Sequence, residues 1–227
     1  FNVFVWKKKQ TIKRYFVNCI EKNQIEITGK GVHRLWNQAN SLTDFDSPWD
    51  EEKIKPIEFK ALYDTKTLYF CFTVQDAEIH VDTTDNTFKS INDSDRVELF
   101  FRSNKLMNPY YCLEIDPLSR IMDFKASPNK EFDFDWHWPS DAIEVKSSIE
   151  STHFTVEIAI SLASLSQLGL LKDGEIETGI YRAKYNKKEN GNFEPTWITW
   201  VNPKTETPNF HTATSFGLLK LDKQDIN

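Results

Sequence analysis

Residues 131–139 read Glu-Phe-Asp-Phe-Asp-Trp-His-Trp-Pro, an alternation of aromatic and polar side chains. In an extended conformation the four aromatic side chains lie on one face, and two aspartates and a histidine lie on the other. Three interpretations of this pattern remain open. The aromatic face packs against the core, or Trp136 and Trp138 present flat rings to a ligand, or the polar face binds a metal ion.

A second candidate lies where a strand-like run ends at Trp200 and a proline-punctuated loop follows. This loop carries Asn202, Phe210 and His211. Loops on a rigid scaffold are common positions for binding residues. The alternative is that Trp200 and Phe210 only close one end of the hydrophobic core.

Acidic residues are concentrated between positions 76 and 98. Calcium prefers oxygen ligands, so Asp85, Asp93 and Asp95 are candidates for a structural calcium site. Their spacing is not that of an EF-hand loop, and solvated loop acids are the simpler interpretation. We expect no cofactor to be required.

Flat aromatic rings beside planar polar side chains suit a sugar as ligand. The apolar CH face of a pyranose stacks on an aromatic ring, and its hydroxyls hydrogen-bond to charged or amide groups. The stacking candidates are Trp136, Trp138 and Phe210, with Trp200 at the edge. The hydrogen-bonding candidates are Arg182, Asn202, His211 and Asp93.

The sequence motifs of common catalytic and nucleotide-binding sites do not occur in this chain. Gly29 and Gly31 lack the third glycine of a dinucleotide loop, because position 34 is arginine, and no phosphate loop, serine elbow or zinc-protease helix motif occurs. With 34 acidic residues, a pair of carboxylates can always be imagined and predicts nothing. We therefore expect a binding protein without catalytic residues.

Charge and composition exclude further classes. The net charge is −6, and no basic stripe for nucleic acid stands out. The longest apolar stretch, residues 154–171, is interrupted by polar residues and cannot span a membrane. Three cysteines make no disulfide framework. We expect a monomer, with any signal peptide removed from the chain shown.

Period-two alternation dominates the chain and predicts an all-β fold. Two antiparallel sheets packed as a β-sandwich are the expected architecture, with about eleven strands and short helices at residues 33–39 and 161–168. One domain covers residues 23–222, residues 1–22 form an extension or an extra strand, and 223–227 form a tail. The expected strands are 24–28, 57–64, 67–75, 96–102, 110–116, 120–125, 142–148, 154–160, 178–185, 195–200 and 216–221.

Six short motifs in order resemble the family 9 carbohydrate-binding modules and their DOMON-like relatives. The most recognisable is the hairpin with Ala-Leu-Tyr-Asp at 61–64 and Thr-Leu-Tyr-Phe at 67–70. Each motif alone is weak, but their order and spacing over residues 25–221 are specific for the fold. The others are 35–39 (Leu-Trp-Asn-Gln-Ala), 95–101 (Asp-Arg-Val-Glu-Leu-Phe-Phe), 110–116, 154–160 and the ending from Trp200 through Phe210 and His211 to Gly217.

This resemblance implies a non-catalytic, exported module that binds plant poly- or oligosaccharides and accompanies xylanases. Some relatives clamp a sugar between two tryptophans, and some carry structural calcium. The clamp positions fall on Asn92 and Phe210, so a two-tryptophan clamp is not expected here, and Trp136 or Trp138 could supply the missing face. The alternatives are a glycan hydrolase, or a DOMON-like domain that binds haem or a protein partner.

Overall fold

A computed structural model describes residues 11–22, 24–51 and 53–222 of the chain. Residues 1–10 of the expected N-terminal segment and the expected tail at 223–227 lie outside the described residues. No helix in the described ranges is both long and apolar enough to cross a membrane.

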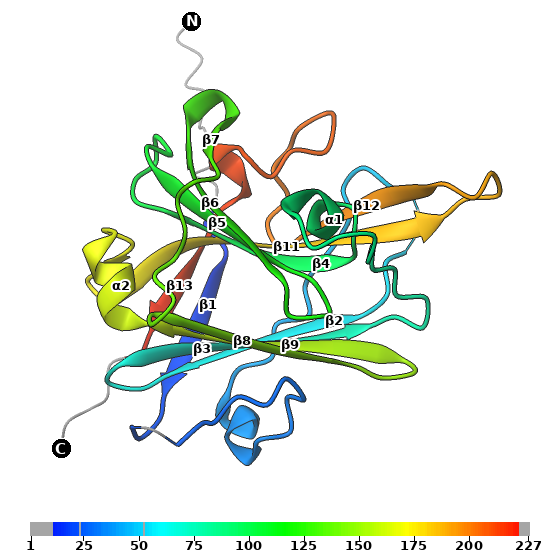
Figure 1. Cartoon of the computed structure of the whole chain (residues 1–227). Helices are drawn as coiled ribbons and strands as arrows, with labels where there is room; N and C mark the ends of the chain where they lie inside the picture. Colours follow the sequence, from blue (N-terminus) through cyan, green and yellow to red (C-terminus); the bar gives the residue numbers. More distant parts are fainter. Residues whose placement is uncertain (1–10, 23, 52, 223–227) are drawn as a thin grey trace, which may run out of the picture.

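The described residues form an all-β fold of thirteen strands in one curled mixed sheet (Figure 1). The strand order is β7-β6-β5-β4-β11-β13-β1-β2-β3-β9-β8, and β10 and β12 both pair with β11. The bounds are β1 Arg14–Cys19, β2 Ile57–Tyr63, β3 Thr67–Gln75, β4 Arg96–Arg102, β5 Tyr110–Ile115, β6 Ile121–Ser127, β7 Glu131–Asp133, β8 Ile143–Ile149, β9 His153–Ser161, β10 Leu171–Lys172, β11 Glu175–Lys187, β12 Phe193–Thr199 and β13 Gly217–Leu221.

Strand β1 makes the sheet continuous. Its first residues pair in parallel with β13 and its last residues pair in parallel with β2. The other pairs of named strands are antiparallel. The prediction of an all-β fold is confirmed, whereas two separate antiparallel sheets of eleven strands are not seen, because β1 connects the two halves.

The main core lies between the two halves of the curled sheet. Alternate residues of β3 and β4 point into it, and the rings of Phe70 and Phe101 face each other with centroids 6.3 Å apart. Burial of these side chains stabilises the fold by about 25 cal/mol per Å² of apolar surface. The outer faces of both halves are also covered, by different segments of the chain.

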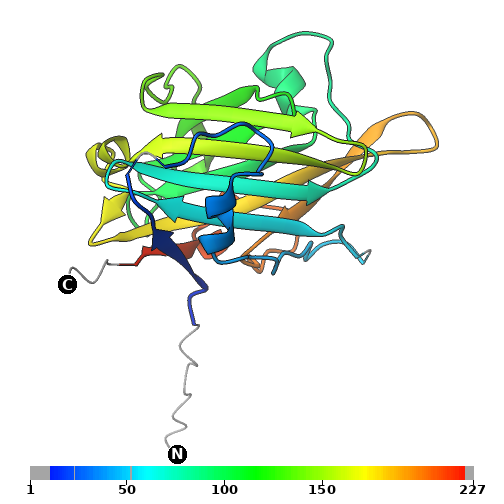
Figure 2. The same cartoon turned by 90° about the horizontal axis from the view of Figure 1, so that it is seen from below.

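Residues 20–22 and 24–39 cover the outer face of β2, β3 and β9 (Figure 2). Ile25, Ile27 and Trp36 are buried there in a third apolar cluster. The predicted strand at 24–28 is wrong, because the backbone N–H groups of Thr28 and Gly29 donate to the carboxylate of Glu157 instead of to a neighbouring strand.

Both predicted helices are present as short turns. The structure contains one further α-helix that the sequence did not predict. The 3-10 helix η1 spans Arg34–Gln38, and α2 spans Leu162–Gln167 with the Ser161 hydroxyl accepting from the N–H of Ser164. The additional helix, α1, spans Phe88–Asn92. Two short 3-10 turns, η2 Pro128–Lys130 and η3 Ala213–Ser215, complete the elements.

Candidate functional site

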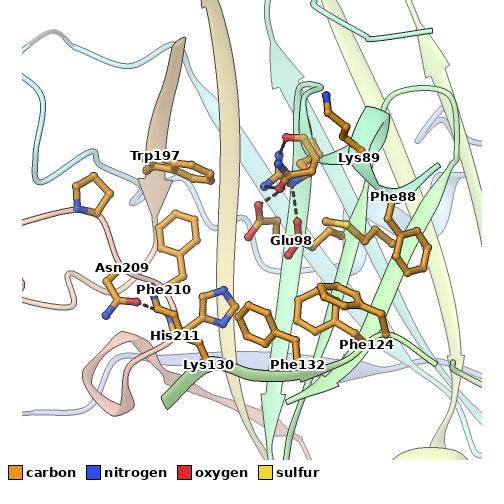
Figure 3. A pocket seen from close by; sticks show the side chains of 16 residues that line it. Phe88, Lys89, Glu98, Phe124, Lys130, Phe132, Trp197, Asn209, Phe210 and His211 are labelled. Carbon is orange, nitrogen blue, oxygen red and sulfur yellow. Dashed lines mark hydrogen bonds and ion pairs between the residues drawn. The ribbon is translucent and has the colours of Figure 1, made fainter. Parts of the chain in front are cut away.

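A pocket of about 600 Å³ opens on the outer face of β4, β5 and β6 (Figure 3). Helix α1, the β6–β7 hairpin, β12 and the loop before β13 surround it. Its lining residues are Phe88, Lys89, Asn92, Arg96, Glu98, Glu114, Met122, Phe124, Lys130, Phe132, Phe134, Trp197, Pro208, Asn209, Phe210 and His211.

Strand alternation places three charged side chains in this pocket. Val97 and Leu99 of β4 face the main core, so Arg96 and Glu98 face outward. Glu114 lies directly opposite Glu98 on β5. Neither carboxylate is more than 4% exposed, so the pocket has a buried, charged floor.

The guanidinium of Arg96 forms ion pairs with both carboxylates of the floor. The Arg96 Nε donates to Glu114 Oε2 at 2.6 Å and lies 3.0 Å from Glu98 Oε1. Because Nε has a single hydrogen, Glu98 Oε1 is left without a hydrogen-bond partner among the described residues. Burial first, and then the charge of Glu114, raise the pKa of Glu98 to about 8, and Arg96 opposes this shift.

Trp197 and Phe210 form one wall. The ring of Phe210 stacks on Tyr181 with centroids 4.1 Å apart, and Trp197 meets it edge-on at 5.6 Å. The Arg96 guanidinium lies 5.6 Å from the centroid of Trp197. Gly179 makes room for this arrangement, because a Cβ there would lie 1.9 Å from the Tyr181 hydroxyl oxygen.

Phenylalanines form the opposite wall. Phe88 comes from α1, Phe124 from β6, and Phe132 and Phe134 from β7 and the turn after it. Figure 3 shows Phe88 and Phe124 across the pocket from Trp197 and Phe210, with Glu98 between them. The pocket therefore has two aromatic walls and a charged floor.

His211 lies between the floor and the phenylalanine wall. Its Nδ1 is 3.0 Å from the Tyr110 hydroxyl, and its ring contacts Phe100 and Phe132. Burial, together with the charges of Lys130 and Arg96, lowers the pKa of His211 to about 3. His211 is therefore neutral at physiological pH.

The structure places Phe210 and His211 in the pocket lining, and it places the three candidate tryptophans elsewhere. Trp138 and Trp200 are buried in the main core, and Trp136 packs against that core. The Nε1 of Trp138 donates to the Ser164 hydroxyl. None of the three lines the pocket, so the expectation that they meet Phe210 at one ligand is not supported.

A turn explains this difference. The extended pattern ends at Asp133, whose Oδ1 accepts from the N–H of Asp135 at 3.2 Å. Phe132 and Phe134 before and within the turn face the pocket, whereas Trp136 and Trp138 after it face the core. The Asp133 carboxylate pairs with Lys125 and accepts from the N–H of Asp135, and the imidazole of His137 bonds Asp123.

The other three polar candidates, Arg182, Asn202 and Asp93, lie outside the pocket lining. Arg182 is 1% exposed within β11, where it pairs with Asp76 at 2.5 Å. Asn202 is exposed and accepts from the N–H of Lys204. Asp93 pairs with Lys89 at 2.7 Å on α1, at the edge of the pocket.

The three acids proposed for calcium do not converge. Asp85 accepts from Thr87, Asp93 pairs with Lys89, and Asp95 is buried with Lys184 and the N–H of Tyr185. Within the described residues, no group of three or more His, Cys, Asp or Glu side chains could hold a metal ion.

The pocket residues that sequence reasoning missed are Arg96, Glu98, Glu114, Trp197 and the phenylalanine wall. A signal for the first two was present, because they occupy alternate positions of an otherwise apolar strand. A charged side chain on a strand buried on both faces is costly unless it has a partner or a function.

Glu98 makes stability depend on pH. Its pKa of about 8 in the folded chain exceeds the ordinary 4.5, so its contribution to stability is present at low pH and is lost as pH rises toward and through 8. Glu98→Gln, which keeps the neutral shape, should remove this loss. We expect the variant to be more stable than wild type at pH 9 and similar at pH 5, as measured by urea unfolding; equal pH profiles for the two chains would contradict this assignment.

Comparison with known proteins agrees with the fold. The family described as "Carbohydrate family 9 binding domain-like" matches residues 27–224. No curated relative matches the chain.

Three solved structures have similar folds. A candidate carbohydrate-binding protein of Bacteroides uniformis has a TM-score of 0.70 at 16% identity, covering 93% of this chain and 100% of its own. A family 9 carbohydrate-binding module of Caldicellulosiruptor kristjanssonii with glucose has a TM-score of 0.62 at 16% identity, covering 95% and 98%. The same organism's family 9 module with cellotriose has a TM-score of 0.63 at 17% identity, covering 95% and 96%.

Proposed function

The chain belongs to the carbohydrate family 9 binding domain-like family, and from this premise we propose that it is a non-catalytic module that binds a saccharide in the pocket on the outer face of β4, β5 and β6. The sugar ring lies over the charged floor with its apolar face toward Trp197. Its hydroxyls bond to Glu98 and to the neighbouring polar groups of the floor.

The observation that carries this proposal is the Glu98 oxygen between two aromatic walls, which lies in an ion pair with Arg96 but has no hydrogen-bond partner among the described residues. A buried polar atom without a partner costs free energy, which a ligand hydroxyl would recover. Aromatic walls with few convergent polar groups are typical of small-ligand pockets. The two sugar complexes of family 9 modules from Caldicellulosiruptor kristjanssonii, with glucose and with cellotriose, add support from structures of similar fold.

Calorimetry against glucose, xylose and their β-linked oligosaccharides tests the proposal directly. We expect binding that saturates at one site and that is weakened when Glu98 is replaced by alanine. No binding to any member of a broad glycan panel would overturn it.

Trp197→Ala is expected to weaken saccharide binding by about tenfold or more, because it removes the stacking face and exposes Arg96 to water. The measurement is the dissociation constant at neutral pH. Phe193→Ala, on the same strand but outside the pocket lining, should leave the affinity unchanged. Equal losses in both variants would show that the effect comes from β12 as a whole.

A glycan hydrolase is the first alternative, because Glu98 and Glu114 are paired carboxylates in a pocket. Hydrolysis needs two carboxyl groups that flank the scissile bond. Here both lie on the same floor, on neighbouring strands, and share one arginine. We expect no release of reducing sugar; release that Glu98→Gln abolishes would favour the enzyme.

A haem-binding domain is the second alternative, because Met122 and His211 both line the pocket and are possible axial ligands. The absorption spectrum of the protein after addition of haem separates the two functions. A Soret shift that is lost in Met122→Leu would favour haem.

The setting of this binding is also a proposal. Plant polysaccharides such as xylan are too large to enter a cell intact, so a module that binds them would act after export, in support of polysaccharide degradation. We also propose that the module acts as a monomer. Binding at this floor requires no metal, and the calcium site stays a prediction.

A further inference from the structure

The pocket is chemically divided into two halves. Asn92, Arg96, Glu98 and Glu114 place the polar groups beneath and beside Trp197. The other half is apolar, with only Lys89, Lys130 and His211 around it. Its lining is Phe88, Met122, Phe124, Phe132 and Phe134.

The phenylalanines of this half form one continuous aromatic surface. The ring of Phe124 lies 5.1 Å from Phe132 and 4.8 Å from Phe134. Phe88 continues the surface at 5.9 Å from Phe134. Phe132 and Phe134 remain 36% and 44% exposed, so they could bury further apolar surface against a ligand.

A second sugar ring fits this half poorly. Phenylalanine and methionine side chains offer no N–H or O–H groups, so hydroxyls placed against them would lose water without gaining partners. Lys89 is already paired with Asp93, and Nδ1 of His211 with Tyr110. A flat aromatic group has no such cost, and it can stack or meet these rings edge-on.

We propose that the saccharide bound in this pocket carries an aromatic substituent, which the phenylalanine half holds while the sugar ring lies over the charged floor. This inference rests on the proposed saccharide binding and names the ligand class more narrowly. The pocket volume of about 600 Å³ suits a ligand larger than one sugar ring.

Matched pairs of glycosides test the proposal. Dissociation constants are measured by calorimetry for the methyl and phenyl β-glycosides of glucose and xylose, and for cellobiose and xylobiose. We expect the better phenyl glycoside to bind about tenfold more tightly than its methyl partner, and more tightly than the disaccharide. Phe134→Ala should remove most of the phenyl advantage and should weaken the methyl glycosides much less than the phenyl glycosides.

Two control variants test whether the tighter binding of phenyl glycosides comes from the phenylalanine half of the pocket. Phe16→Ala removes a similarly exposed phenylalanine from β1, outside the pocket lining, and should change neither affinity. Trp197→Ala should weaken the methyl and phenyl glycosides alike, because it acts on the sugar ring. Phe132→Ala gives a second, independent change in the phenylalanine half.

The measured affinities separate the proposed aromatic substituent from the proposed saccharide binding. Methyl and phenyl glycosides of equal affinity would overturn the aromatic substituent and leave saccharide binding in place. A disaccharide gain as large as the phenyl gain, lost in Phe134→Ala, would place a second sugar ring there and also overturn it. Binding of the phenyl glycosides alone, dependent on Phe134, would support it, and binding of no compound would overturn both proposals.

Discussion

Replacing Arg96 with alanine is expected to lower the free energy of unfolding by about 3–5 kcal/mol at pH 7, the range for breaking a buried ion pair from one side. Arg96 is the only cation within ion-pair distance of Glu98 and Glu114 among the described residues. Both carboxylates are buried, and Glu114 Oε2 would lose its 2.6 Å bond. Urea unfolding measures the loss.

The pH dependence of this loss identifies its cause. Without Arg96 the folded-state pKa values of Glu98 and Glu114 rise further, so the missing stability is recovered as pH falls and both carboxyls become protonated. The difference from wild type should therefore shrink at pH 5 and grow at pH 9. Arg14→Ala, at an exposed position of β1, serves as the matched control and should cost little.

Arg96→Ala should also weaken saccharide binding, because Arg96 contacts other residues around the pocket. An Arg96 terminal nitrogen donates to the carbonyl of Asn92 at 2.6 Å, which ties the end of α1 to the floor. Its guanidinium also lies near the ring of Trp197. If Arg96→Ala changed neither stability nor affinity, the charged floor would have no role in this pocket.

The sequence predicted the strands where apolar and polar residues alternate over several positions. The hairpin of β2 and β3 is the clearest case, since both strands and the short polar turn between them appear where expected. Strand β1 was harder, because its partners β2 and β13 are distant in the chain and both pair with it in parallel. Such long-range pairing leaves no local pattern.

Residue type alone misplaced the candidate tryptophans. Trp138 and Trp200 have the chemistry to stack on a sugar, but a large apolar ring is equally suited to the core, where both lie. The turn at Asp133 decided which aromatic residues of 131–138 face the pocket. Phe210, which was selected for its position in the loop as well as for its type, lines the pocket.

A second large loss of stability is expected when Glu157, on the opposite half of the sheet, is replaced. Its carboxylate is fully buried and accepts from the N–H groups of Thr28 and Gly29 at 2.8 and 2.6 Å, and from Nε1 of Trp36 at 2.7 Å. Glu157→Ala leaves these buried donors without an acceptor, at about 1–3 kcal/mol each. We expect a total loss of about 3–5 kcal/mol in urea unfolding, since partial exposure to water will recover some of it.

The hydrogen bonds of Glu157 hold residues 24–39 over the third apolar cluster, and a near-isosteric substitution separates their contribution from that of packing. Glu157→Gln keeps the volume but turns an N–H group toward one set of donors, so it should still lose much of the stability. Glu144→Ala, at an exposed ion pair on β8, should cost little. Because the pocket lies on the other half of the sheet, the folded Glu157→Ala variant should bind saccharide with wild-type affinity. Arg96→Ala, in contrast, should lose both stability and saccharide binding. Wild-type stability of Glu157→Gln would show that the shape of the side chain, and not its hydrogen bonds, holds the segment.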